Sequence, residues 1–141
     1  MLISLEEKHK QALTEKDFCQ KHIQKVIDKI KIHTTGACWH IQEVSSYAIS
    51  QAQQLDSLSF EEKSKMPLFG LTVGMKDLFC VKGLTTTSGS KILEHFKSPY
   101  DSTMWSRLKD KGVLLGAKLA MDEFAMGSFS NTSIVLTGLS R

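Results

Sequence analysis

The sequence predicts an α/β fold, and two observations carry that prediction. Two short apolar runs, residues 71–75 and 113–115, have the character of strands, and a segment with helical signals lies between them. A strand, crossover helix and strand in that order favour a parallel pair in one sheet. Residues 1–66, before Pro67, show mainly helical periodicity instead. With 41% hydrophobic residues, a chain of 141 residues is long enough for one domain.

Two helices are expected at the start of the chain. Ser4 and Glu7 have capping-box spacing, in which the serine hydroxyl accepts a backbone N–H and the carboxylate reaches back. Thr14 and Asp17 repeat the spacing before a longer helix that ends near residue 32. We interpret its lysine face as the solvated side of an amphipathic helix rather than as a contact for nucleic acid or protein. The apolar face comprises Cys19, Ile23, Val26, Ile27 and Ile30, and the lysine face Lys21, Lys25 and Lys29.

A short strand and a third helix are expected next. The helix breakers at residues 34–36 precede a strand candidate at residues 37–41. Residues 42–55 then show one apolar stripe of helical period, and residues 56–66 form a polar linker to Pro67. The stripe comprises Val44, Ala48, Ala52 and Leu55.

Lys76 closes the first apolar run and is the most informative residue. Leu71, Val73 and Met75 alternate with small or polar residues, which is the period of a strand buried on one face. An ammonium group at a partly buried strand end must find a carboxylate or have its pKa lowered. A lysine that is neutral at the working pH can act as a general base. The alternative is that Lys76 and Asp77 form a solvated turn.

A loop rich in threonine, serine and glycine follows this strand. Its end, Gly89-Ser90-Lys91, is followed by Ile92, so it lacks the Lys-Ser/Thr ending of a phosphate-binding loop, and we reject nucleotide binding there. We expect its hydroxyl groups to shape the loop through hydrogen bonds to nearby backbone.

The rest of the chain completes the crossover. Asp101 is expected to cap a helix that turns Met104 and Leu108 inward, with Trp105 as a third candidate, and Gly112 to end it. Residues 121–128 are expected to form a short helix or turn after the second strand. We expect the adjacent carboxylates there, Asp122 and Glu123, to be structural, because neighbouring residues of a helix point in different directions.

Composition and spacing exclude several classes of site. The net charge of +3 is mild, and no arginine-rich or aromatic-basic tract indicates a nucleic-acid surface. No apolar run reaches membrane-spanning length. Neither the cysteines nor the histidines have the spacing of a metal site, so free thiols in a reducing compartment and no metal are expected. These residues are Cys19, Cys38 and Cys80, and His9, His22, His33, His40 and His95.

Taken together, five segments resemble the amidase signature family. They are residues 67–77, 82–91, 98–103, 112–116 and 121–128, in that order and spacing. Within the family, the run Asp-Glu-Phe-Ala-Met-Gly-Ser at residues 122–128 looks most like the A subunits of glutamyl-tRNA(Gln) amidotransferases. The resemblance runs from about Leu5 to about Ser133 and is specific after Pro67.

The resemblance implies a fold and a set of site residues. The fold would be the N-terminal portion of an α/β/α sandwich with a mixed central sheet, with residues 1–66 as a helical layer and 67–141 as the start of the sheet. The family uses a Ser, a cis-Ser and a Lys, and Lys76 matches the lysine. Met126, Gly127 and Ser128 match the family's substrate pocket. No glycine-flanked serine pair occurs in this sequence, and residues 134–141 depart from the family, as an interrupted gene would produce.

The resemblance also implies an activity for the larger enzyme. The family member would hydrolyse glutamine and supply ammonia for converting Glu-tRNA(Gln) to Gln-tRNA(Gln), together with B and C subunits. ATP and magnesium would act at the partner subunit, the tRNA would bind through the complex, and the location would be the cytoplasm or an organellar matrix. The present chain would be a truncated piece, inactive alone. The alternatives are a general amidase for a small amide and a non-catalytic fragment.

Overall fold

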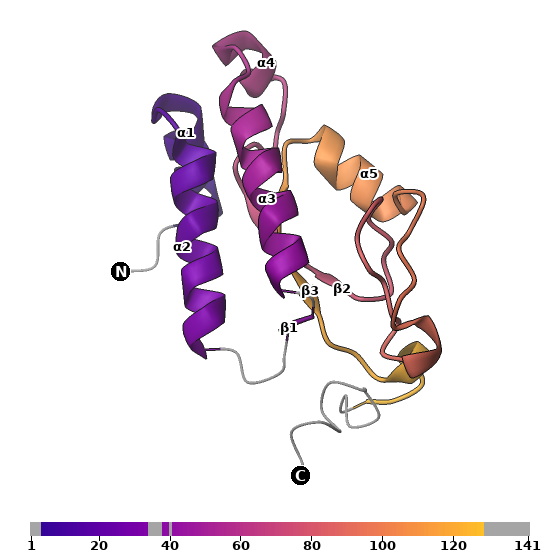
Figure 1. The fold of residues 1–141 in the computed structure, drawn as a ribbon. Coiled ribbons are helices and arrows are strands. Elements are labelled where there is room, and N and C mark those ends of the chain that lie inside the picture. Colours follow the sequence, from indigo (N-terminus) through magenta and orange to yellow (C-terminus); the bar gives the residue numbers. More distant parts are fainter. Residues whose placement is uncertain (1–3, 34–37, 40, 129–141) are drawn as a thin grey trace.

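The chain folds into helices packed on a small sheet. The structure is a computed structural model that describes residues 4–33, 38–39 and 41–128. Figure 1 shows α2 and α3 side by side, with β2 and β3 near the lower end of α3 and α5 on the other side of α3 from α2. The helices are α1 (Leu5–Thr14), α2 (Phe18–His33), α3 (Ile41–Asp56), α4 (Phe60–Ser64) and α5 (Thr103–Asp110); the strands are β1 (Cys38–Trp39), β2 (Thr72–Lys76) and β3 (Leu114–Leu119); and the 3-10 turns are η1 (Lys91–Leu93) and η2 (Glu123–Ala125).

The sheet is mixed, and its order is β1-β3-β2. β2 pairs with β3 in parallel, and β1 pairs with β3 in the antiparallel sense. The predicted α/β class and the predicted parallel pair are therefore confirmed. β3 continues to Leu119, beyond the expected end at residue 115. β1 falls within the predicted strand at residues 37–41, of which residues 37 and 40 lie outside the described residues.

Local capping determines where the first helix begins. Ser4 and Glu7 form the predicted capping box at the start of α1. The second predicted box is wrong, because Thr14 is the last residue of α1 and its hydroxyl donates back to carbonyls of the preceding turn. A threonine hydroxyl that is hydrogen-bonded to carbonyls of its own helix is not available to cap the next helix.

The start of α2 is capped from a distant part of the chain. The carboxylate of Asp56, at the end of α3, accepts hydrogen bonds from the backbone N–H groups of Cys19 (3.1 Å) and Gln20 (3.0 Å). These are N–H groups that a helix cannot satisfy internally. One carboxylate thus joins the start of α2 to the end of α3.

Two apolar clusters cover the two faces of β3. Successive residues of a strand point to opposite faces, and Leu114 and Leu115 accordingly lie in different clusters. The predicted α3 stripe is buried, from Ala48 and Ala52 at 0% exposure to Leu55 at 8%. The first cluster contains Ala12, Phe18, Cys19, Ile23, Ile27, Ala48, Ala52, Leu55, Phe69 and Leu114. The second contains Val44, Met75, Val81, Leu84, Trp105, Val113 and Leu115.

Two expectations about connecting segments are wrong in detail. The linker at residues 56–66 contains α4, which begins with a capping box of Ser59 and Glu62. α5 is capped by Ser102 instead of Asp101, because the Asp101 carboxylate accepts a hydrogen bond from the Lys82 backbone at 2.6 Å.

The inward face of α5 also differs from the expectation. Trp105 is fully buried in the second cluster, whereas Met104 is 50% exposed. Leu108 is partly buried and packs against that cluster. Trp105 and Leu108 therefore face inward, and the expectation is wrong only for Met104. Within the described part of the chain, no helix is both long and apolar enough to cross a bilayer.

Candidate functional site

The candidate site lies where β2 and β3 end. Lys76 is the last residue of β2 and pairs in register with Leu119, the last residue of β3. The backbone N–H of Asp77 extends this pairing by donating to the Leu119 carbonyl at 3.0 Å. The carboxyl ends of neighbouring parallel strands are where α/β proteins place their ligands.

The side chain of Lys76 is exposed, and the expectation of partial burial is wrong for this chain. Among the residues that the structure describes, its ammonium group has no hydrogen-bond or ion-pair partner. β2 is the outer strand of the described sheet, so no further strand flanks Lys76 on that side. The surroundings of the Lys76 side chain therefore depend on what packs against the open edge of β2.

The buried lysine of the site is Lys118, on β3. Its ammonium group lies 3.0 Å from one carboxylate oxygen of Asp77, and both side chains have 0% exposure. It also donates to the carbonyl of Phe79 (2.6 Å) and to the hydroxyl of Thr86 (3.1 Å). Two hydrogen bonds and one ion pair thus compensate the buried ammonium charge.

The other oxygen of Asp77 organises the loop of threonines and serines. It accepts hydrogen bonds from the backbone N–H (2.9 Å) and the hydroxyl (2.6 Å) of Thr87. The Thr87 hydroxyl in turn accepts from the N–H of Gly89 at 3.1 Å. The predicted hydroxyl-to-backbone bonding is thus confirmed, and the loop is buried rather than solvated. Its buried members are Thr85, Thr86, Thr87, Ser88 and Ser90.

The same loop holds the segment that follows β3. The N–H of Ser88 donates to the carbonyl of Asp77 (3.1 Å), and the Ser88 carbonyl accepts from the N–H of Phe124 (2.8 Å). The hydroxyl of Ser90 donates to the Glu123 carboxylate at 2.6 Å. Glu123 therefore has a structural partner, as expected. Through Ser88, the end of β2 and the η2 segment are fixed relative to each other.

The three predicted pocket residues lie at the surface after η2. Met126 is 82% exposed, and Gly127 and Ser128 are exposed as well. A Cβ atom at Gly127 would lie 2.4 Å from Cγ of Asp122, so glycine is required for this close approach. The structure brings these residues to the same end of the sheet as Lys76, and no described interaction joins them to it directly.

The thiol of Cys19 lies in the first apolar cluster, away from this end. Burial is the main cause that raises the pKa of the Cys19 thiol well above its ordinary value, so this thiol stays protonated. Cys19 and Cys80 are free thiols.

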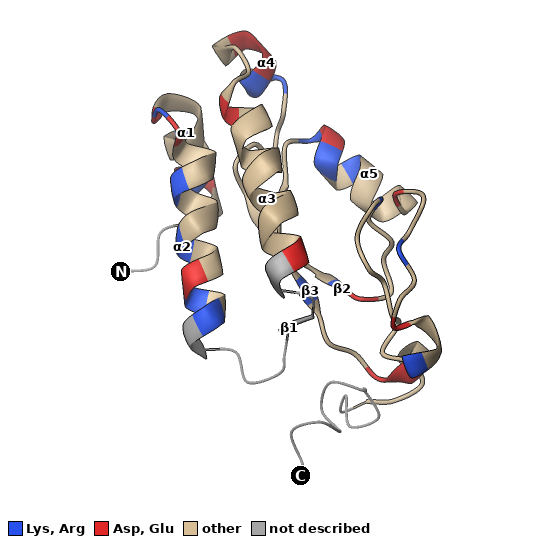
Figure 2. Ribbon diagram, viewed as in Figure 1, with Lys and Arg blue, Asp and Glu red and all other residues tan. Residues whose placement is uncertain are grey.

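The described residues include no group of three or more His, Cys, Asp or Glu side chains placed to hold a metal ion. Figure 2 shows basic positions recurring along α2, and Lys21, Lys25 and Lys29 are exposed there.

Sequence reasoning missed Lys118, although a signal for it exists. A single lysine interrupts an apolar run that continues from residue 113 to residue 119. Asp77 directly follows the neighbouring strand and lies two residues beyond Met75, the register partner of Lys118, so the parallel pairing brings opposite charges close together. A lone charge in a buried strand indicates a buried partner.

Comparison with known proteins identifies relatives over most of the chain. The sequence model of the Amidase family matches residues 21–138. The chain is 48% identical over 86 residues to the A subunit of glutamyl-tRNA(Gln) amidotransferase from Bdellovibrio bacteriovorus, covering 61% of this chain and 18% of the relative. It is 38% identical over 132 residues to the protein of the same name from Ehrlichia ruminantium, covering 93% of this chain and 27% of the relative.

Solved structures agree with this likeness. The crystal structure of the A subunit of glutamyl-tRNA(Gln) amidotransferase from Thermotoga maritima matches with a TM-score of 0.66 at 27% identity, over 93% of this chain and 25% of that one. A crystal structure described as an amidase matches with a TM-score of 0.67 at 27% identity, over 89% of this chain and 28% of that one. The chain thus spans between 18% and 27% of the length of the two relatives above.

Proposed function

Because the chain belongs to the amidase family, we propose that it is the lysine-bearing portion of a glutamyl-tRNA(Gln) amidotransferase A subunit. The observation that carries the proposal is the place of Lys76 at the carboxyl end of a parallel strand. Relatives that bear this name match the chain over as much as 93% of its length.

In this proposal Lys76 is the general base of a Ser-cisSer-Lys site that hydrolyses glutamine. A free lysine is almost fully protonated near neutral pH and cannot take a proton. Burial lowers the pKa of a lysine and makes a neutral amine available. Because Lys76 is exposed in this chain, the portion of the domain that carries the serines must cover it. That portion would also supply the backbone donors for the oxyanion.

The remaining parts of the reaction would belong to other components. B and C subunits would complete the complex, and ATP and magnesium would activate glutamate at a partner subunit. The tRNA would bind through the complex, in the cytoplasm or an organellar matrix. Met126, Gly127 and Ser128 would line the glutamine pocket, a role that fits their exposed position after η2.

A general amidase that acts on a small amide is the second candidate. It is favoured by the solved amidase structure, whose TM-score of 0.67 is as high as the 0.66 of the amidotransferase structure. The two candidates share Lys76 and differ in partners, so copurification with B and C subunits separates them. The third candidate is a non-catalytic fragment.

A chimera tests the proposal. Residues 1–128 are joined to the remainder of the A subunit from Thermotoga maritima, and the product is assembled with that organism's B and C subunits. We expect glutamine-dependent release of ammonia from the chimera and none from the isolated chain. Lys76→Met should abolish glutamine hydrolysis and leave amidation with free ammonia intact. An isolated chain whose ammonia release depends on Lys76 would contradict the requirement for the serine-bearing portion.

A further inference from the structure

Lys76 is followed in the sequence by a carboxylate that does not face it. Successive residues of an extended chain point to opposite sides, and Asp77 directs its carboxylate to Lys118 and Thr87. Within the described part of the chain, Lys76 itself has no ion-pair partner. Two opposite charges that are neighbours in the sequence are thus kept apart by a lysine of the adjacent strand.

The turn after Lys76 presents two acceptors to Lys118. The N–H of Phe79 donates to the carbonyl of Lys76 at 2.9 Å, which folds the chain back after β2. The Asp77 carboxylate and the Phe79 carbonyl then lie 3.0 Å and 2.6 Å from the ammonium of Lys118. Lys118 therefore holds the turn that follows Lys76 and compensates a charge at the same time.

The oxygen of Asp77 that faces Lys118 is held by charge alone. It is buried and accepts no hydrogen bond from any described residue, although it lies 3.0 Å from the ammonium, so this contact is an ion pair. The second oxygen has both of its hydrogen bonds from Thr87. A buried carboxylate oxygen of this kind needs a nearby positive charge. If Lys118 were removed, the nearest cation in the sequence would be Lys76.

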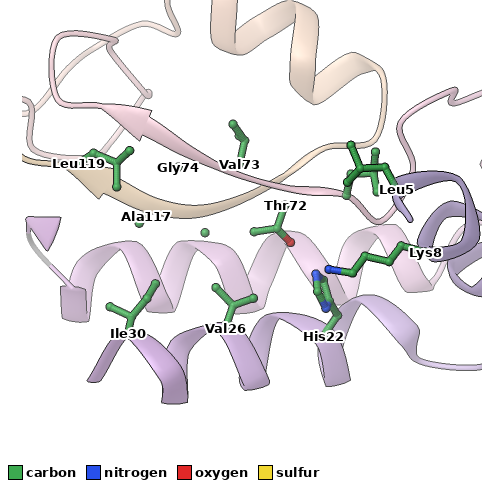
Figure 3. A pocket seen from close by; sticks show the side chains of 12 residues that line it. Leu5, Lys8, His22, Val26, Ile30, Thr72, Val73, Gly74, Ala117 and Leu119 are labelled. Atoms are coloured by element: carbon green, nitrogen blue, oxygen red, sulfur yellow. The ribbon is translucent and has the colours of Figure 1, made fainter. Parts of the chain in front are cut away.

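The face of β2 that carries Lys76 borders a groove without acidic groups. Thr72 and Gly74 alternate onto the same face as Lys76 and line an open groove of about 370 Å³ between α2 and the strands. Figure 3 shows Lys8 and His22 at this groove, and none of the described residues that line it is acidic. Burial, followed by the charges of three lysines, lowers the pKa of His22, so the groove is a region of positive charge; the lysines are Lys8, Lys25 and Lys29.

Two carboxylates follow β3 at this end of the sheet, and both have surroundings of their own. Glu123 accepts a hydrogen bond from a serine hydroxyl of the loop at 2.6 Å. Asp122 is buried, with 5% of its surface exposed. Asp77 is therefore the carboxylate that its place in the sequence favours as a partner of Lys76, and Lys118 is the group that holds it elsewhere.

We propose that Lys118 is a positioning residue for the base: it holds the Asp77 carboxylate away from Lys76, so that no adjacent counter-charge keeps the Lys76 amine protonated. An opposite charge within about 4–6 Å favours the charged form of a group, whereas a general base must be available in its neutral form. The role of Lys118 in the reaction rests on the proposed function. The separation of the two charges does not, and it is measured on its own.

The charge state of Lys76 is measured by its rate of reaction with an amine-acylating reagent over a range of pH, in the 141-residue chain. Mass spectrometry of the peptide that contains Lys76 gives the pH of half-maximal reaction. Lys118→Gln removes the ammonium, keeps a hydrogen-bond donor, and should raise this pH by about one unit or more. The exposed Lys82, acylated in the same samples, should keep its pH dependence. An unchanged pH for Lys76 in a folded Lys118→Gln variant overturns the proposal.

A double variant tests the same claim without an unpaired buried charge. Asp77→Asn with Lys118→Met removes both charges, which proteins tolerate well at a buried pair, and should leave the pH of Lys76 acylation unchanged. A shift to lower pH would overturn the proposal, because it would show that the Asp77 charge already acts on Lys76 in the parent. This test decides even if Lys118→Gln does not fold, which the fluorescence of the buried Trp105 reports.

Thr87→Val is the control for a loosened loop. It removes a hydrogen bond to Asp77 and changes no charge, so it should lower stability and leave the acylation of Lys76 as it is in the parent. A shift as large as that of Lys118→Gln would assign the effect to movement of the loop and overturn the proposal.

The chimera with the Thermotoga maritima subunits connects the charge state to the reaction. Lys118→Gln should move the acidic limb of the pH–rate profile of glutamine hydrolysis upward by the same amount as the acylation of Lys76. A purely structural role would lower the rate alike at every pH, and an acidic limb that does not move overturns the positioning role. If acylation shifts as expected and the parent chimera hydrolyses no glutamine, the proposed function fails, and with it the positioning role, while the separation of the two charges is retained.

Discussion

Lys76 and Lys118 come from neighbouring strands at almost the same level of the sheet and have opposite environments. Lys118 is fully buried and paired with Asp77, whereas Lys76 pairs in register with the next residue of β3 and is exposed. The difference arises because the threonine and serine loop covers one face of the strand ends. The other face, with the open groove, has no such cover among the described residues. The buried charge is a fixed part of this chain, and the exposed one is available to a partner.

The largest expected effect is at the closed face. Asp77→Asn leaves the buried ammonium of Lys118 without a counter-charge, and we expect a loss of about 3–5 kcal/mol of unfolding free energy. Urea unfolding in a stabilising osmolyte, followed by the fluorescence of the buried Trp105, measures it. The double variant Asp77→Asn with Lys118→Met removes both charges and should recover most of the loss. A single variant within about 1 kcal/mol of the parent would contradict the closed-face account.

A smaller effect is expected from the loop that covers this face. Thr87→Val removes a hydroxyl that donates to Asp77 at 2.6 Å and accepts from Gly89. Hydrogen bonds to charged groups contribute about 1.5–3 kcal/mol, so a loss in that range is expected in the same urea experiment. Thr103→Val, at an exposed position of α5, is the matched control. Equal losses for both variants would show that the threonine hydroxyl does not hold the loop.

The open face should give a weak dependence on pH. Because the folded chain lowers the pKa of His22 below its ordinary value of 6.5, the unfolded chain binds a proton there more readily. The stability of the free chain should therefore fall as the pH drops through 6.5. His22→Gln should flatten this part of the pH profile. If the unfolding free energies of the parent and the variant depend on pH with the same slope near pH 6.5, His22 is not the source of the dependence.

The smallest expected effect is at Lys76 itself. Its exposed side chain has no described partner, so Lys76→Met should change the unfolding free energy of the isolated chain by less than about 0.5 kcal/mol. The same urea experiment measures it beside Asp77→Asn. A loss above about 1 kcal/mol would mean that Lys76 has a structural partner and would weaken the contrast between the two lysines.

Local signals in the sequence were sufficient for much of the fold. The capping box of Ser4 and Glu7, the apolar stripe of α3 and the parallel pairing of β2 with β3 depend on short spacings and handedness rules. The box of Ser59 and Glu62 has the same spacing, so the start of α4 was equally predictable from it.

Long-range contacts limited the prediction of the rest. Asp56 caps a helix that begins 38 residues earlier in the chain, and no local pattern indicates that pairing. The burial of Lys118 depends on polar contacts with Asp77 and Thr86, which belong to other segments of the chain. The exposure of Lys76 depends on which strand is outermost, a property of the sheet as a whole. The role of Lys76 as a base and the pocket roles of Met126, Gly127 and Ser128 stay predictions.

Replacement of Lys76 by arginine in the chimera tests the central claim most directly. Arginine keeps the positive charge and cannot deprotonate in this pH range. If Lys76 is the base, Lys76→Arg should lower glutamine hydrolysis by several orders of magnitude and leave amidation with free ammonia unchanged. Retention of most of the hydrolysis rate by Lys76→Arg would contradict the claim and leave Lys76 with a charge-dependent structural role.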